Sequence, residues 1–301
     1  MIARKIYLNQ LISLCNQNII KVITGIRRCG KSTLLSEFKD YLKTKGVEED
    51  NILLLNFEER EYSDFERWED VYDYILDKLS VKGMKYVFLD EVQRIVCFEK
   101  LVDALFVKKD IDLYITGSNA FLLSSELGTL LSGRYITINL HPFSFSEYVS
   151  AFENNANTDR LFRQYMNASC FPEAVNLSIS SPNMVNTYLK SLYDTVVVKD
   201  IIKRHNLRKF DSLQNIINYL FDSVGSIVSP NNIAEALSKN ESSVSHNTVK
   251  KLITYLTESY LIYPVRLYNR KAKRVHESKY KYYVTGGGLN NTLLTNSYET
   301  D

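Results

Sequence analysis

The chain has 301 residues, of which 45% are hydrophobic, and its 37 lysines and arginines nearly balance its 35 acidic residues. This length favours two or three domains. A net charge of +2 is too small to indicate a particular kind of partner, such as nucleic acid. No run is apolar and long enough to span a membrane, and the N-terminus has no apolar signal core, so we expect a soluble, cytoplasmic protein. The four cysteines form no Cys-x-x-Cys pair, which disfavours disulfides and a zinc site.

Strand and helix patterns alternate over residues 1 to about 150. In chain order, apolar runs and helical spacing predict a strand at 19–23, a helix at 34–42, a strand at 51–57, a helix at 68–79, a strand at 86–89, a helix at 98–106, and strands at 113–115 and 136–140. Strands alternating with helices of this length predict an α/β domain with a mostly parallel sheet covered on both faces.

The pattern changes after Pro142. The polar stretch 153–159 is typical of a linker, and helical signals without glycine extend from 161 to 208. Residues 213 to about 283 predict three helices and then strands, followed by a tail without regular pattern. We therefore expect three units, with bounds 1–150, 151–210 and 211–301.

The segment Gly25–Ser32 matches the pattern G-x-x-x-x-G-K-[ST] between a predicted strand and a predicted helix. Glycines let successive backbone N–H groups point inward, and a helix N-terminus adds positive potential, so both favour bound phosphate. Lys31 is expected to reach the β- and γ-phosphates of a nucleoside triphosphate, and the Ser32 hydroxyl is expected to hold Mg²⁺. Further nucleotide contacts are expected from Gly25, Gly30 and the loop's other polar side chains, which are Arg27, Arg28 and Thr33.

Two carboxylates, Asp90 and Glu91, follow the apolar strand that begins at Tyr86. At the carboxyl end of a strand, Asp90 is placed to hold the Mg²⁺ shell. Glu91 would polarise a water for attack on the γ-phosphate. Because a P-loop kinase has no need of such a base beside the metal aspartate, the pair favours hydrolysis over phosphoryl transfer to a metabolite.

Two further candidates for catalysis are Asn119 and Arg134. If the strand ending at Thr116 neighbours the acidic strand, Asn119, or else Ser118, could orient the attacking water, although both also suit a turn or a helix cap. Arg134 could stabilise transition-state charge. The loop arginines 27 and 28 compete for that role, and they could instead pair with Glu58 or Glu59.

The last third of the chain has the spacing of a helix-turn-helix. Ser229-Pro230 begins one helix, and Ser245 caps a longer one with an apolar face. A basic segment rich in tyrosine follows, with Arg266, Arg270, Lys271, Lys273, Arg274, Lys279 and Lys281. Residues 245–281 therefore suit either a regulatory or scaffold role with a protein partner, or contacts to the phosphates of double-stranded DNA.

The segment Thr24–Leu35 resembles that of prokaryotic AAA-type ATPases of the AAA+ superfamily, whose P-loop reads G-x-R-R-x-G-K-[ST]. Other segments that fit the same group lie at 89–93, 115–119, 131–134, 142–148, 171–173 and 200–204. The resemblance implies ATP as the nucleotide and an AAA+ core with the acidic pair on the strand beside the P-loop strand. It also implies a helical lid and a winged-helix-like unit for the second and third units.

Members of this group often continue into a domain that resembles a restriction endonuclease, whereas this chain stops at Asp301. We expect a truncated product or a lost domain, and we carry over no nuclease activity.

Two functions follow from these patterns. The first is an ATPase that hydrolyses ATP with Mg²⁺ and moves its helical and winged-helix units. The alternative is a nucleotide-gated module that binds DNA or protein with little hydrolysis. A homo-oligomer is compatible with both.

Overall fold

The computed structural model describes residues 2–62, 64–65, 67–79, 82–120, 131, 133–152, 157–168, 170–207, 210–238, 244–269 and 274–298. Residue contacts divide the chain into two compact units, Met1–His141 and Pro142–Asp301. The division falls at Pro142, where the alternation of strands and helices in the sequence stops.

Unit 1 contains a five-stranded sheet in the order β2-β3-β4-β1-β5. Its strands are β1 (Ile20–Thr24), β2 (Ile52–Asn56), β3 (Lys85–Asp90), β4 (Ile111–Gly117) and β5 (Tyr135–Asn139). Every neighbouring pair is parallel. This sheet confirms the predicted α/β core, because each expected strand is present and parallel strands joined by helices place those helices on the faces.

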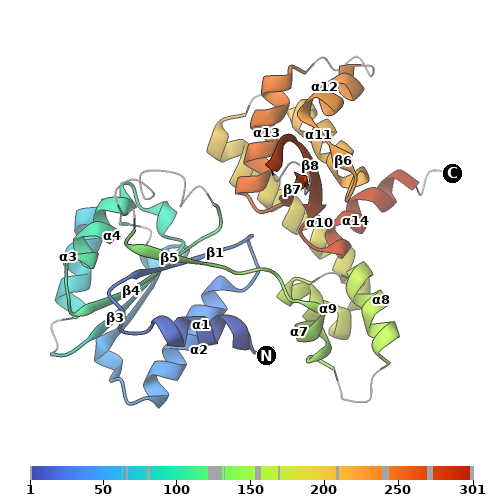
Figure 1. Cartoon of the computed structure of the whole chain (residues 1–301). Coiled ribbons are helices and arrows are strands. Elements are labelled where there is room, and N and C mark those ends of the chain that lie inside the picture. Colours follow the sequence, from blue (N-terminus) through green and yellow to red (C-terminus); the bar gives the residue numbers. More distant parts are fainter. Residues whose placement is uncertain are drawn as a thin grey trace. The chain divides into compact units, whose positions relative to one another are not determined.

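Among the described residues of unit 1, four helices cover the sheet: α1 (Lys5–Leu14), α2 (Lys31–Thr44), α3 (Trp68–Lys78) and α4 (Phe98–Phe106). Figure 1 shows α3 and α4 on one face and α1 and α2 on the other. Alternate strand residues such as Val22 and Leu89 share a core with Val71 and Leu101 of α3 and α4. On the opposite face, the ring of Phe38 in α2 lies 5.1 Å from that of Tyr114.

The sheet order corrects one expectation. β4 lies between β3 and β1, so the acidic strand is not beside the P-loop strand. Tyr114 of β4 stands opposite Phe88 of β3 on one side and Lys21 of β1 on the other. The buried side chains of Lys21 and Asp112, which form an ion pair between β1 and β4, fix this position. All five strands still end at the same edge of the sheet.

Unit 2 begins with helices α7 (Phe145–Val149), α8 (Thr158–Ala168), α9 (Pro172–Ser180) and α10 (Val185–Thr195), the last continuing as a π-helix over Val196–Lys203. Next come α11 (Phe210–Asp222), α12 (Pro230–Ser238) and α13 (His246–Glu258). A small sheet has the order β6-β8-β7, made of β6 (Ile227–Val228), β7 (Ile262–Asn269) and β8 (Arg274–Val284). Among the described residues, no helix combines the length and apolar character that crossing a membrane requires.

The chain after residue 284 was expected to be irregular, but it forms the helix α14 (Gly287–Tyr298). Its polar, asparagine- and threonine-rich sequence lacks the apolar periodicity that marks a helix. Packing against α8 explains the helix: a Cβ on Gly287 would lie 2.8 Å from the Met166 carbonyl oxygen, so glycine permits the close approach. Asn291 then donates to that carbonyl at 3.3 Å.

Candidate nucleotide-binding site

The P-loop connects the carboxyl end of β1 to the start of α2, and two of its glycines have structural causes. The Leu140 N–H donates to the Thr24 carbonyl at 2.7 Å, and a Cβ on Gly25 would lie 2.2 Å from the Leu140 carbonyl oxygen. Gly30 has φ of +101°, a left-handed conformation that glycine adopts without strain, and it caps the N-terminus of α2. Only glycine therefore fits the loop at both positions.

Lys31 is the first residue of α2, and its side chain is buried within the loop. Its ammonium donates to the Gly25 carbonyl at 3.0 Å and to the Ile26 carbonyl at 3.4 Å. It also lies 3.5 Å from Oε1 of Glu91. The structure thus brings the P-loop lysine and the second carboxylate of the acidic pair together.

Asp90 ends β3 and is 1% exposed. The Thr116 hydroxyl donates to its Oδ1. Burial raises the pKa of Asp90, while hydrogen bonds from Ser32 and Thr116 partly offset that rise because they favour the charged form. The two residues expected to hold Mg²⁺, Ser32 and Asp90, are therefore neighbours.

The donor set fits Mg²⁺, which prefers hard oxygen ligands and usually binds through one or two protein groups plus substrate phosphates and water. Here a serine hydroxyl and a carboxylate supply the oxygens. Within the described part of the chain, His, Cys, Asp and Glu form no group of three or more that could hold a metal ion. A magnesium ion at this site would need phosphate oxygens and water to complete its coordination.

Glu91 has a left-handed backbone, with φ of 55° and ψ of 45°. Such a conformation costs about 1–3 kcal/mol for a residue other than glycine and persists where surrounding contacts impose it. Those contacts are present: its N–H donates to the Thr116 hydroxyl at 3.0 Å, and the Gln93 amide donates to its Oε2 at 2.5 Å. Together with Lys31, they fix the Glu91 carboxylate beside the P-loop.

Thr116 is the functional residue that the sequence reasoning missed. It is fully buried in β4, and its hydroxyl contacts both members of the acidic pair. Asn119 and Ser118, the residues favoured from sequence, are fully buried just beyond the strand. A signal existed, since Leu89 stands opposite Ile115 and the next pair in that register is Asp90 with Thr116. The sequence alone does not fix that register.

Arg134 is placed away from these residues. It precedes β5, and its carbonyl accepts from the Ile20 N–H at the start of β1, so it lies at the edge opposite the P-loop. The length of β5 separates the two edges by roughly 17 Å. Its guanidinium, about half exposed, pairs with Asp103 at 2.9 Å. Within one chain, Arg134 is not brought to the phosphate site.

The loop arginines have different environments. Arg27 pairs with Glu58 at 3.0 Å, which confirms the alternative that the sequence left open. Arg94 contacts the same Glu58 oxygen at 3.0 Å. Burial alone would raise the pKa of Glu58, but the hydrogen bonds and charges of the two arginines lower it below its ordinary value. Arg28 has φ of 66° and an exposed side chain.

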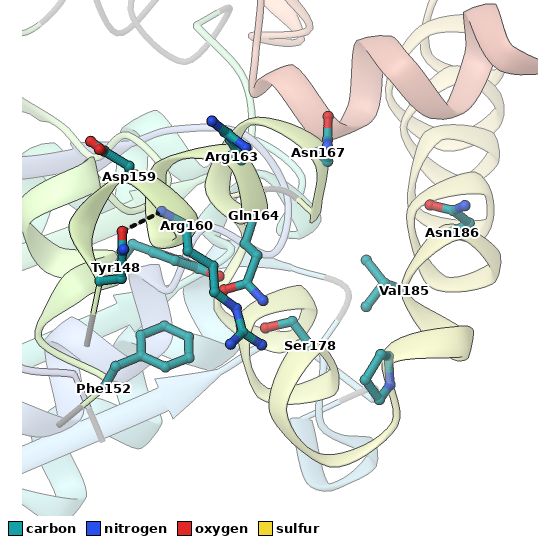
Figure 2. A pocket seen from close by; sticks show the side chains of 12 residues that line it. Tyr148, Phe152, Asp159, Arg160, Arg163, Gln164, Asn167, Ser178, Val185 and Asn186 are labelled. Carbon is teal, nitrogen blue, oxygen red and sulfur yellow. Dashed lines mark hydrogen bonds between the residues drawn. The ribbon is translucent and has the colours of Figure 1, made fainter. Parts of the chain in front are cut away.

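A cavity of about 620 Å³ lies among α7, α8, α9 and the start of α10 in unit 2 (Figure 2). In Figure 2 the Arg160 side chain extends toward Ser178, whereas Arg163 points elsewhere. None of the residues predicted to bind nucleotide or metal lines this cavity. All of its lining residues belong to unit 2.

A parallel sheet of this order, with a P-loop after β1 and an acidic pair at the end of β3, defines a nucleotide-binding domain of the AAA+ class of P-loop ATPases. Comparisons with known proteins agree. A family model described as an AAA domain matches residues 17–149, and one described as a domain of unknown function matches residues 159–300.

The chain is 36% identical over 293 residues to an uncharacterized protein of Haemophilus influenzae, covering 96% of this chain and 72% of that protein. It is 27% identical to an uncharacterized protein of Methanocaldococcus jannaschii, covering 92% of this chain and 62% of that one. The chain therefore belongs to the AAA+ ATPase family that includes the Haemophilus protein, and it spans about two thirds of the length of these relatives.

A Walker-type ATPase of Pyrococcus abyssi has a similar structure, with a TM-score of 0.62 at 14% identity over 97% of this chain and 96% of that one. At this identity the similarity concerns the fold.

Proposed function

We propose that this chain binds ATP with Mg²⁺ and hydrolyses it. The observation that carries the proposal is one buried cluster in which Thr116 contacts both Asp90 and Glu91, while Glu91 contacts Lys31. The P-loop lysine, a metal-binding carboxylate and a base are thus held in a single network. Its members come from α2, from β3 and the residue that follows it, and from β4.

Each residue has a role in this proposal. Lys31 binds the β- and γ-phosphates, and Ser32 and Asp90 hold Mg²⁺, which neutralises phosphate charge when bound. Glu91 accepts the proton of the attacking water, and Gln93 orients its carboxylate. Thr116 keeps Asp90 and Glu91 in register with each other.

The substitution Glu91→Gln tests the role of the base. A positioned base contributes about 10²–10⁴ to a rate, so phosphate release should fall by that factor while ATP binding persists. Binding is measured by titration with a fluorescent ATP analogue. The control is Glu59→Gln, an exposed glutamate beyond β2. Turnover by Glu91→Gln at the Glu59→Gln level would exclude Glu91 as the base.

We also propose that unit 2 binds duplex DNA with the surface formed by α13 and β7–β8. The Ser245 side chain caps α13, as expected, and the helix exposes Lys250, Lys251 and Thr254. A cavity of about 500 Å³ beside it is lined by Lys250 and Arg266. Three other basic residues of the proposed surface, Arg270, Lys271 and Lys273, lie outside the described residues.

Three helices followed by an antiparallel strand pair are the arrangement of a winged helix, and this distribution of cations suits phosphate contacts. Duplex DNA should bind with an affinity that falls steeply with salt, and it should change the rate of phosphate release. Absence of binding at low salt would instead favour a protein partner for this surface.

A further inference from the structure

Arg4, which precedes α1, has a buried guanidinium that spans two distant parts of unit 1. The residue is only 3% exposed. It donates to the Cys29 carbonyl at 3.2 Å and to the His141 carbonyl at 2.5 Å, and it stacks over the ring of Tyr7 at 4.8 Å. Because a buried charge needs partners that replace water, these contacts hold the guanidinium in one place.

The first of these carbonyls belongs to the P-loop. The peptide bond from Cys29 to Gly30 is trans, so its C=O and its N–H point in opposite directions. With the Cys29 carbonyl held by Arg4, the Gly30 N–H points away from Arg4. Backbone N–H groups facing the interior of the loop are what a P-loop offers to phosphate. By holding the Cys29 carbonyl, Arg4 therefore fixes the orientation of the Gly30 N–H, a donor available to phosphate.

The second carbonyl belongs to the last residue of unit 1. The segment ending at His141 is joined to the P-loop strand at further points: the Thr24 hydroxyl donates to Oδ1 of Asn139 at 2.6 Å, and the Leu140 N–H donates to the Thr24 carbonyl at 2.7 Å. Gly25 also packs directly on the Leu140 carbonyl. The P-loop and the chain leading out of unit 1 are therefore joined by hydrogen bonds and close packing.

The Arg4 backbone is fixed as well, because its N–H hydrogen-bonds to the Glu37 carboxylate in α2, the helix that the P-loop begins. A lysine would not reproduce these two contacts, since its one nitrogen lacks the planar fork in which two separate nitrogens reach carbonyls of distant segments. Arginine is thus required by geometry and not by charge alone.

We propose that Arg4 is a positioning residue that orients the Gly30 N–H toward bound phosphate and transmits nucleotide occupancy to residues 139–141, where the chain enters unit 2. The proposal rests on the nucleotide binding proposed above. A phosphate oxygen accepting from the Gly30 N–H polarises the same peptide, which strengthens its carbonyl as an acceptor for Arg4. Because the same guanidinium also donates to the His141 carbonyl, a stronger bond to Cys29 changes the bond to His141.

The test uses the full chain with Arg4→Met, which removes the charge, and Arg4→Lys, which keeps the charge but not the fork. Lys5→Met removes an exposed neighbouring cation and serves as the control. Two quantities are measured: affinity for a fluorescent ATP analogue, and hydrogen–deuterium exchange over residues 139–145 with and without saturating non-hydrolysable ATP analogue.

In the wild type and Lys5→Met, the analogue should change exchange over residues 139–145. In both Arg4 variants, affinity should fall about tenfold, the effect of one lost charged hydrogen bond. The exchange response should then be lost even at saturation. A merely structural role would lower affinity or thermal stability without abolishing the response at saturation.

Should Arg4→Met fail to fold, Arg4→Lys tests the same point. An exchange response of wild-type size in the folded variants at saturation would overturn the inference while leaving nucleotide binding intact. A wild type that does not bind the analogue at all would overturn the proposed function and this inference with it.

Discussion

The acidic pair depends on a single hydroxyl. Thr116 donates to Asp90 and accepts from the Glu91 N–H, so it holds the proposed metal-binding group and the proposed base in fixed relation. Hydrogen bonds that favour the charged form of Asp90 also oppose the rise in its pKa on burial. At the scale of residues, the site is therefore a network and not a pair of independent carboxylates.

Thr116→Val should lower ATP turnover about tenfold or more, because it keeps the side chain's shape but leaves the Asp90 carboxylate and the Glu91 N–H without this buried partner. The same loss should lower the free energy of unfolding by about 1–3 kcal/mol. Steady-state phosphate release and urea unfolding measure the two effects. Thr116→Ser retains the hydroxyl and is expected to remain near wild type. Equal activity of the valine and serine variants would contradict this role.

The residues that the sequence predicted in the site are those whose position follows from local pattern. Lys31 and Ser32 are set by the loop and the helix after it, and Asp90 and Glu91 by the end of an apolar strand. Thr116 and Gln93 act through strand register and a left-handed turn at Glu91. Neither register nor that turn follows from one sequence, because both depend on packing between strands.

At the scale of elements, β1 and β4 are joined at their amino ends by a buried polar network. Lys21 pairs with Asp112, the Tyr114 hydroxyl donates to Asp112 at 2.8 Å, and the Asn16 N–H donates to the same carboxylate at 2.8 Å. Removing one member of a buried ion pair leaves the other uncompensated. This network explains why β4 takes the place beside β1 that the resemblance had given to β3.

The network should make the free energy of unfolding depend on pH in the alkaline range, through Tyr114. Burial, and then the Asp112 charge, raise the pKa of Tyr114 far above its ordinary value. Above pH of about 10 the unfolded chain ionises this tyrosine while the folded chain keeps its proton, so the wild type loses up to about 1.4 kcal/mol per pH unit through it. Tyr114→Phe should be less stable than the wild type at pH 8, because its hydrogen bond to Asp112 is missing. Its free energy of unfolding should not fall with pH through this position, because phenylalanine does not ionise.

The stability gap between wild type and Tyr114→Phe should therefore narrow between about pH 10 and pH 11. Urea unfolding at pH 8 and pH 11 measures it. A gap that stays constant or widens would mean that the Tyr114 hydroxyl is not held protonated by the fold.

At the scale of the whole molecule, Arg134 lies at the edge of the sheet opposite the P-loop. We propose that it acts on the nucleotide of a second copy, since within its own chain the sheet lies between them. An arginine that completes a phosphate site contributes about 10³–10⁵ in rate, so Arg134→Ala should be nearly inactive while still binding ATP.

Mixing Arg134→Ala with Lys31→Ala tests the second copy directly. The first variant supplies an intact P-loop and the second an intact arginine, so random pairing should restore up to about a quarter of wild-type turnover. Activity of the mixture equal to the sum of the separate variants would contradict action between copies.

The strands and helices of unit 1 were predictable because hydrophobic periodicity is a local property of the sequence. Contacts between distant segments, between units or between copies of the chain do not follow from local patterns. The sequence predicted every strand of the core, but the neighbour that the resemblance implied for the P-loop strand was wrong. It also missed α14, because that helix is specified by its close approach to α8. The pairing of Arg134 with Asp103 could likewise not be predicted from the sequence.

The measurement that tests the central claim most directly is steady-state phosphate release from ATP and Mg²⁺ by the purified chain, beside Lys31→Ala. The account predicts release by the wild type that falls to background in the variant, because the Lys31 ammonium is the group placed to bind the β- and γ-phosphates. A wild type that neither releases phosphate nor is thermally stabilised by ATP would contradict it.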